Sequence, residues 1–388
     1  MKKNTKKKLN RKDKFKELKK EAIPMSSTPL FLKNAYGISV MTDSGLFQIG
    51  DGVFSKLYRL VIGDTSVKAQ DVFTILRGYD CKYRIYHFQD NVYLSILFKS
   101  EKADVWVACD DLYKNMSSQF SELSISVEDI DADERMKIIH GLILDNENLP
   151  FDKSYMDNNF ILDWKEDFEL SNLKEEVDHF FKKDDEYKIF YVREFSDKIS
   201  KFISEISEME DIKGIITQFD PVSDQAVQAF FKKNYMGTDN LLENMLRNNP
   251  DVYKIYTQEI KDDSRHFTMC GVMFMARVNN PEVEEKINFS ASRYDIEIAY
   301  FHVNMLDAYK EFLPIGKWQL SESRDVASEF ASKALLPTYF AQEEQEDNID
   351  DFLLDTDFVF DDEPKNEDEK SYDIDEYDDD DDDNDNYE

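Results

Sequence analysis

The sequence predicts an α+β protein with two lobes, each built on a mixed or antiparallel sheet with packed helices. Of its 388 residues, 41% are hydrophobic and 13% are aromatic, so the chain is large enough to bury the cores of two domains. Gly (11) and Pro (9) are scarce, which argues against a loop-rich or collagen-like protein. Segments with the alternation of half-buried strands are interleaved with segments of helical spacing.

We predict a β-rich first lobe at residues 30–144, after a basic tail at residues 1–29. Turn residues such as Asp51-Gly52 separate runs of strand-like alternation. The expected strands are Gly37–Thr42, Leu46–Ile49, Val53–Ile62, Lys82–Phe88 and Val92–Phe98. Apolar residues with helical spacing predict helices at Ser66–Tyr79 and Ala132–Leu144. This order indicates a sheet with a helix packed on one face.

We interpret residues 145–186, which are polar and irregular apart from Phe160–Trp164, as the connection between the lobes. The second lobe, residues 187–340, alternates predicted strands with predicted helices. The expected strands are Tyr187–Val192, Ile212–Phe219, Phe267–Val278 and Ile296–His302. The expected helices are Ser196–Glu208, Pro221–Lys233, Leu241 to about Asp262, and one that begins at Pro281. This order predicts a ferredoxin-like sheet with a helical insertion. We expect no internal repeat beyond the general likeness of the two lobes.

Charge is distributed unevenly along the chain, whose net charge is −34. Residues 1–22 hold eleven Lys or Arg and three acidic residues, whereas residues 343–388 hold 25 acidic residues and two Lys. We expect residues 341–388 to form a disordered acidic tail. The body between the two ends is also acidic and repels phosphate groups, so we do not expect direct nucleic-acid binding.

Apolar and aromatic side chains are set within the acidic tail, as is typical of segments that become ordered on a partner. The predicted partner-binding residues are Phe352, Leu353, Phe358, Phe360, Asp378, Asp379, Asp380, Asp381, Asp382 and Asp383. A basic partner protein, or the chain's own basic arm, is the expected target. Two other interpretations stay open: the tail mimics DNA and occupies a basic groove, or it only keeps the chain soluble.

The basic N-terminal arm is predicted to contact a partner or a membrane surface. Lysines near an anionic lipid surface are attracted by about 1 kcal/mol per charge. The residues concerned are Lys2, Lys3, Lys6, Lys7, Lys8, Arg11 and Lys12. Without a lipid anchor, such an arm attaches to a membrane only weakly and reversibly. The alternative interpretation is that residues 1–22 are an unstructured tail.

The sequence does not nominate a catalytic, cofactor-binding or metal-binding residue, and we do not expect an enzyme. Its one Gly-Lys pair, Gly316-Lys317, is followed by Trp318, and Glu311 stands where a P-loop has its first glycine. No two of the five histidines lie within ten residues of each other, so no metal site is expected.

Cysteine usage and hydropathy indicate a cytoplasmic protein. Cys81, Cys109 and Cys270 are widely spaced and form no CxxC pair, which favours free thiols in a reducing compartment. Cys270 lies in an apolar predicted strand, where a buried and inert thiol is expected. No signal peptide is recognised, and no window approaches about 18 uninterrupted apolar residues.

Three segments resemble the N-terminal region of the TraE/TrbE/CagE-type conjugative transfer ATPases of type IV secretion systems, particularly those of Gram-positive elements. The first is Asp43–Leu60, the second is Asp133–His140, and the third is Phe312–Arg324. The second is followed by Phe160–Lys165 and the third by Ala334–Pro337. Their order agrees with the family from about residue 34 to residue 339. Val61–Asp64 departs from the family pattern, and the ATPase module is missing, so no catalytic residue is carried over.

The resemblance implies a cytoplasmic, membrane-associated subunit at the base of a conjugation channel. We therefore expect a non-catalytic accessory or scaffold component that binds or regulates a full-length ATPase relative or a channel subunit, and that can enter an oligomer. One alternative is an acidic regulator or DNA mimic that acts through its tail. Another is the docking half of a split conjugation ATPase whose motor is a separate chain.

Overall fold

The structure is a computed structural model of the chain. It describes residues 30–42, 44–63, 67–79, 81–88, 91–99, 105–144, 170, 173–182, 184–222, 250, 267–302, 304–316, 324–327, 331–335 and 339–340. The two tails, the segment 145–169 and most of residues 223–266 lie outside this part.

The first unit follows a short helix, α2 (Leu30–Tyr36). Its elements are β1 (Val40–Met41), β2 (Phe47–Gly50), β3 (Val53–Ile62), α3 (Ala69–Arg77), β4 (Lys82–Phe88), β5 (Asn91–Lys99), α4 (Val105–Glu122), β6 (Ile125–Asp129) and α5 (Ala132–Leu144). The four main strands pair antiparallel in the order β6-β3-β5-β4. This is the strand order of a ferredoxin-like βαββαβ sheet.

The second unit repeats this arrangement. Its elements are β7 (Leu173–Glu175), β8 (Phe180–Lys182), β9 (Asp185–Glu194), α7 (Ile199–Ser207), β10 (Ile212–Pro221), β11 (Phe267–Arg277), α11 (Pro281–Arg293), β12 (Glu297–Tyr300) and α12 (Met305–Phe312). The main strands pair antiparallel in the order β12-β9-β11-β10. A last strand, β13 (Arg324–Ala327), pairs with the start of β11.

The two units match in detail as well as in element order. In each unit a preceding hairpin pairs with the first half of the central strand, and the last strand of the unit pairs with its second half. Each central strand also carries a buried lysine, two residues before the first residue that pairs with the last strand of the unit. Lys56 forms an ion pair with Asp129 on β6, and Lys188 lies 4.8 Å from the ring centroid of Tyr300 on β12.

The two ferredoxin-like units form one continuous sheet of 13 strands, because β4 pairs antiparallel with β10. The register places Tyr86 opposite Ile216, Ile85 opposite Thr217, and Arg84 opposite Gln218. Both strands are the outer strands of their units. Their pairing removes two open edges and leaves no boundary in the sheet between the units.

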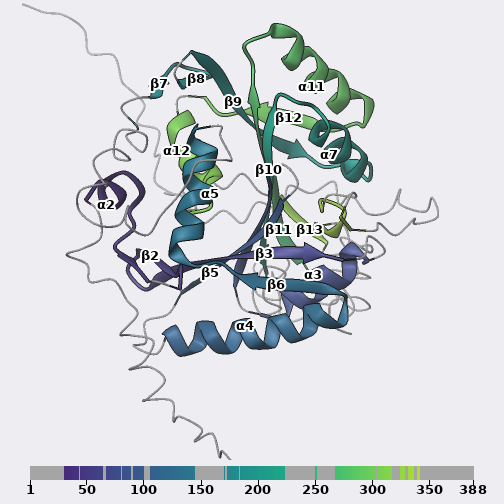
Figure 1. Cartoon of the computed structure of the whole chain (residues 1–388). Coiled ribbons are helices and arrows are strands. Elements are labelled where there is room, and N and C mark those ends of the chain that lie inside the picture. Colours follow the sequence, from purple (N-terminus) through teal and green to yellow (C-terminus); the bar gives the residue numbers. More distant parts are fainter. Residues whose placement is uncertain are drawn as a thin grey trace, which may run out of the picture.

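Helices cover both faces of this sheet, and each face has its own apolar core. One core contains buried residues of α3, α4, α7 and α11, and the other contains residues of α2, α5 and α12. Figure 1 shows α4 and α5 on opposite sides of β3, β5 and β6. Alternate residues of β4 divide between the cores: Ile85 joins the first, and Tyr86 and Phe88 join the second.

The observed elements confirm the α+β prediction and the ferredoxin-like strand order of the second unit. The first unit has the same strand order, which the sequence analysis did not predict. The helices α2, α4 and α12 and the strand β6 were not predicted. In α4 the signal is weak because buried apolar residues such as Met116 and Phe120 lie at wide intervals among polar ones. The predicted connection at 145–186 contains the hairpin β7–β8. Most of the predicted insertion lies outside the described residues. Pro221 ends β10 and does not begin a helix, whereas Pro250, in the second predicted helix, is helical.

Local sequence signals explain where α11 begins, as predicted at Pro281. Asn280 is the N-cap, and its side-chain oxygen accepts a hydrogen bond from the Glu282 backbone N–H at 3.1 Å. Pro281 occupies the first turn, where a missing N–H costs nothing. Glu282 and Glu284 in the first turn and Arg293 in the last turn complement the helix dipole.

We predict that Gly214→Ala destabilises the protein through the contact between the units. Gly214 lies in β10 beside a register irregularity, and an added Cβ would lie 2.3 Å from Phe88 Cδ1 and 3.1 Å from Phe312 Cζ. Overpacking of this kind costs about 1–3 kcal/mol of unfolding free energy. Equilibrium denaturation would measure the loss.

Gly50→Ala is the matched control, because its Cβ would meet its nearest atoms, on Val53, at 3.6 Å. Its effect should stay below about 1 kcal/mol. Equal stability of the Gly214→Ala variant and the wild type would contradict the close contact between the units.

Candidate functional site

The sequence-predicted contact residues of the acidic tail, at 352–383, and of the basic arm, at 2–12, lie outside the described residues. Within the described residues, polar groups gather at a different place, the junction between the two units. This junction consists of the paired strands β4 and β10 with the elements that cover them. None of its charged or titratable residues was nominated by the sequence analysis.

A fully buried ion pair crosses the junction on the α12 side of the sheet. Arg84 on β4 and Glu311 on α12 are both 0% exposed, and Arg84 Nη2 lies 3.0 Å from Glu311 Oε2. The same guanidinium donates to the Glu311 backbone carbonyl at 2.7 Å and to Gln218 Oε1 on β10 at 3.1 Å. A buried charge needs such compensation, since desolvation costs several kcal/mol per ion. Arg84 therefore connects the first unit to a strand and a helix of the second.

A second buried arginine holds the turn that follows α12. Arg135 on α5 is 0% exposed, and its guanidinium donates to the carbonyls of Gly45, Ser55, Pro314 and Ile315 at 2.8–3.2 Å. It also lies 4.0 Å from the ring centroid of Phe47. Burial lowers the pKa of Arg135 to about 9. Neutral carbonyls thus solvate a cation that water does not reach.

Gly316 completes this turn and has to be a glycine. Its φ is +93°, and a Cβ there would lie 2.2 Å from Ser55 Oγ. Ser55 Oγ in turn accepts a hydrogen bond from Arg135 Nη2 at 2.6 Å. Gly316 therefore belongs to the packing between the turn after α12 and β3, which gives this glycine a structural role.

The three segments that carry the resemblance to conjugation ATPases meet at Arg135. The first segment supplies Gly45, Phe47 and Ser55, the second supplies Arg135 itself, and the third supplies Pro314 and Ile315. Arg135 and Ile315 alone are 180 positions apart in the sequence. The segments therefore form one packed cluster in space.

Among the residues that the structure describes, a histidine on the opposite face of the junction has no hydrogen-bond partner. Both ring nitrogens of His87, on β4, are buried without a partner. The ring stacks on Tyr339, with centroids 5.8 Å apart and an interplanar angle of 17°. Burial alone lowers the pKa of His87 to about 3, so the imidazole is neutral at physiological pH. An unpaired buried polar group of this kind costs about 1–3 kcal/mol.

The three cysteines are free thiols, as predicted. Cys270 is buried within β11, and burial raises the pKa of its thiol. Burial also raises the pKa of the Cys109 thiol to about 11. Neither environment favours the thiolate that a nucleophile needs.

The described residues contain neither a metal-ligating cluster nor a membrane-spanning helix. No group of three or more His, Cys, Asp or Glu side chains is arranged there to hold a metal ion. Within the same residues, no helix is both long enough and apolar enough to cross a membrane.

A signal for the junction was present in the sequence. Arg84 interrupts a strand of apolar and aromatic residues, and Arg135 falls on the apolar stripe of the helix Ala132–Leu144. A charge at an inward position of an element has to find a partner inside the fold. That signal identifies the residue but not its partner, because Glu311 and Pro314 follow many residues later.

Comparison with known proteins gives no family for this chain. No protein-family model and no curated protein matches the sequence. The proposed function therefore rests on the residues and the geometry described above.

We predict strong coupling between Arg84 and Glu311. Arg84→Met or Glu311→Leu alone leaves an uncompensated buried charge, which costs about 3–5 kcal/mol of unfolding free energy. The double variant should lose clearly less than the sum of the two, because both charges are then gone. Denaturant unfolding of all four proteins gives the coupling energy.

Lys114 and Asp110 provide the control cycle, with the same charge types 2.9 Å apart on the outside of α4. Exposed pairs of this type couple by about 0.3–0.5 kcal/mol. Additive losses at Arg84 and Glu311 would show that the buried pair does not act as a unit.

We predict that His87 makes the protein sensitive to acid. The unfolded imidazole binds a proton below its ordinary pKa of about 6.5, whereas the folded imidazole stays neutral down to about pH 3. Stability is therefore retained above pH 6.5 and lost as the pH falls below it. At pH 5 the difference of about 1.5 pH units corresponds to about 2 kcal/mol.

His87→Phe keeps a ring against Tyr339 and removes the proton-binding group. Between pH 7 and pH 5 the wild type should therefore lose about 2 kcal/mol more stability than this variant. At pH 8, where both side chains are neutral, the comparison reports the packing change alone. Parallel stability profiles of the two proteins would contradict a neutral buried His87.

Proposed function

We propose that this protein is a non-catalytic assembly component of a conjugative type IV secretion apparatus. Its two-unit body binds a TraE/TrbE/CagE-type motor ATPase or a neighbouring channel subunit. The protein acts in the cytoplasm, with its basic arm held loosely at the inner face of the membrane. No hydrolytic step is assigned to this chain.

The observation that carries the proposal is the cluster around Arg135. Three short resemblances could arise separately by chance, but residues from all three segments contact one buried guanidinium. In this proposal the chain and the ATPases share one packing arrangement. It brings together a strand pair, a helix and the turn that corresponds to the one after α12. This favours a common scaffold over three unrelated similarities.

The charge distribution supports a protein partner with a basic surface. The chain has a net charge of −34, and its acidic tail carries apolar side chains that can anchor in a partner's pockets. Attraction of this kind raises the rate of encounter and falls with salt, because the Debye length shortens to about 3 Å at 1 M.

Affinity capture from donor cells that carry the conjugative element tests the proposal. The tagged full chain should recover a P-loop ATPase of the transfer apparatus after crosslinking, and deletion of its gene should lower the transfer frequency. Replacing Phe352, Leu353, Phe358 and Phe360 with Ser leaves the net charge unchanged and should reduce recovery several-fold. About 1 M salt should reduce it as well.

The control replaces Asp378, Asp379, Asp380, Asp381, Asp382 and Asp383 with Asn, which removes charge and keeps the apolar anchors. Recovery of a protein outside the transfer apparatus does not support the proposal. Capture of DNA-binding proteins alone, lost in this Asn variant, would overturn it and favour a DNA mimic. Normal transfer in the deletion strain would also overturn it.

A further inference from the structure

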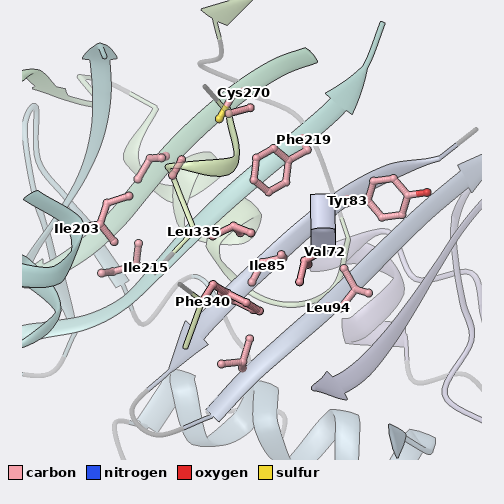
Figure 2. Packing of buried hydrophobic residues seen from close by; sticks show 14 of the residues in the cluster. Val72, Tyr83, Ile85, Leu94, Ile203, Ile215, Phe219, Cys270, Leu335 and Phe340 are labelled. Carbon is pink, nitrogen blue, oxygen red and sulfur yellow. The ribbon is translucent and has the colours of Figure 1, made fainter. Parts of the chain in front are cut away.

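The helix α11 carries an exposed phenylalanine on its outer face. Its buried residues Val283, Ile287 and Ala291 join the core on the α3 and α7 side of the sheet, where Ile203 of α7 is also buried (Figure 2). Phe289 lies on the other side of the helix and is 69% exposed. In Figure 1, α11 lies at the outer rim of the second unit. The outer face of an amphipathic helix is normally polar, and an aromatic ring there is typical of a contact with another molecule.

Phe289 differs from the other exposed apolar side chains. In the part of the chain that the structure describes, the exposed large apolar residues are Val61, Val177 and Phe289. Val61 lies on β3 and Val177 lies in the connection between β7 and β8. Single exposed valines are normal on a protein surface. A phenylalanine removes more apolar area from water when another molecule covers it.

The exposed charges of α11 sum to zero, although the chain as a whole has a net charge of −34. The exposed acidic residues of the helix are Glu282 and Glu285, and the exposed basic residues are Lys286 and Arg293. Each lies three, four or seven positions from Phe289, so all four share its face of the helix. A basic partner finds no surplus of negative charge on this face.

The same charges complement each other when two copies of α11 lie antiparallel with their Phe289 rings in contact. Residues at equal distances before and after Phe289 then face each other across a two-fold axis. Glu285 of each copy lies opposite Arg293 of the other, and Lys286 lies opposite the exposed Ser292. A parallel arrangement would place Glu285 beside Glu285 and Arg293 beside Arg293, and like charges repel.

Arg293 is already positioned for this contact. Its side chain is 58% exposed, and its Nη1 lies 3.1 Å from Glu205 Oε2 on α7. A guanidinium has five N–H donors, so one ion pair leaves donors for a carboxylate of a second copy. The contact with Glu205 restricts the arginine beforehand, which lowers the entropy that association costs.

We propose that the outer face of α11 is the interface through which two copies of this protein associate, with the helices antiparallel about a two-fold axis at Phe289. One helix face is smaller than the roughly 800 Å² per partner of a standard interface. The dimer is therefore weak and reversible. This inference concerns self-association and does not rest on the proposed function, which the capture experiment tests separately.

Sedimentation equilibrium of the full chain tests the interface, at about 0.15 M salt, where repulsion between the acidic copies is screened beyond roughly 8 Å. The wild type should pass from monomer to dimer as its concentration rises to about 1 mM. Phe289→Ser should raise the dissociation constant at least ten-fold. Because Phe289 is exposed, the midpoint of thermal unfolding should stay the same.

Val177→Ser is the matched control, because Val177 is 66% exposed but lies away from α11, between β7 and β8. It should leave the dissociation constant unchanged. A wild type that stays monomeric at every concentration would overturn the proposal and leave this face to a different protein. An equally tight dimer of the Phe289→Ser variant would overturn it as well.

Charge reversal tests the antiparallel arrangement. Glu285→Arg places two basic side chains opposite each other, and Arg293→Glu places two acidic ones opposite each other. Each variant alone should therefore associate at least ten-fold more weakly than the wild type. An equal mixture of the two should form a heterodimer, because each new charge then faces its opposite on the other chain.

Thermal unfolding checks that both variants are folded, since Arg293→Glu also loses the contact with Glu205. Two folded variants that do not associate when mixed would overturn the antiparallel dimer. If Arg293→Glu does not fold, the Glu285→Arg variant decides. Unchanged self-association of that variant would overturn the proposal.

Discussion

The pairing of β4 with β10 determines which side chains can meet in this molecule. Side chains alternate along a strand, so each residue of the pair faces one of the two cores. Arg84, Tyr86 and Gln218 face α12, whereas Thr217 faces Ala334 and His87 faces Tyr339. A shift of the register by one residue would carry Arg84 to the other face and leave Glu311 buried without it. The strand pairing and the buried ion pair therefore depend on each other.

The buried arginines specify how the second unit sits on the first. Replacing a buried ion pair with apolar groups is often neutral or stabilising, so Arg84 and Glu311 are not needed to create a core. Their geometric requirements are narrow, however. Arg84 reaches the side chain and the carbonyl of Glu311 together, and Arg135 reaches four carbonyls, two of them in the turn after α12. These contacts fix both the position of α12 and the place where it ends.

The internal repeat is broken where the two units touch. Tyr86 and Ile216 face each other at the middle of the junction, so the residues two positions before them, Arg84 and Gly214, occupy equivalent places. One unit supplies a long cation there, and the other supplies no side chain, which makes room for Phe88 and Phe312. The buried residues Leu335 and Phe340 add a second asymmetry, because they belong to the core on the α3 and α7 face of the junction. A nearly symmetric framework thus presents two faces of different chemistry.

The sequence by itself determined the α+β class, the positions of most strands and the ferredoxin-like order of the second unit, because hydrophobic periodicity is a local property. It also determined the start of α11, where Asn280 and Pro281 act within one turn. Only the tertiary structure decided that β4 pairs with β10, that both units share one strand order, and that Arg84 meets Glu311 across 227 positions. The physical reason is that pairing between distant strands and compensation of buried charge depend on which surfaces meet in space, and short-range spacing carries no record of that.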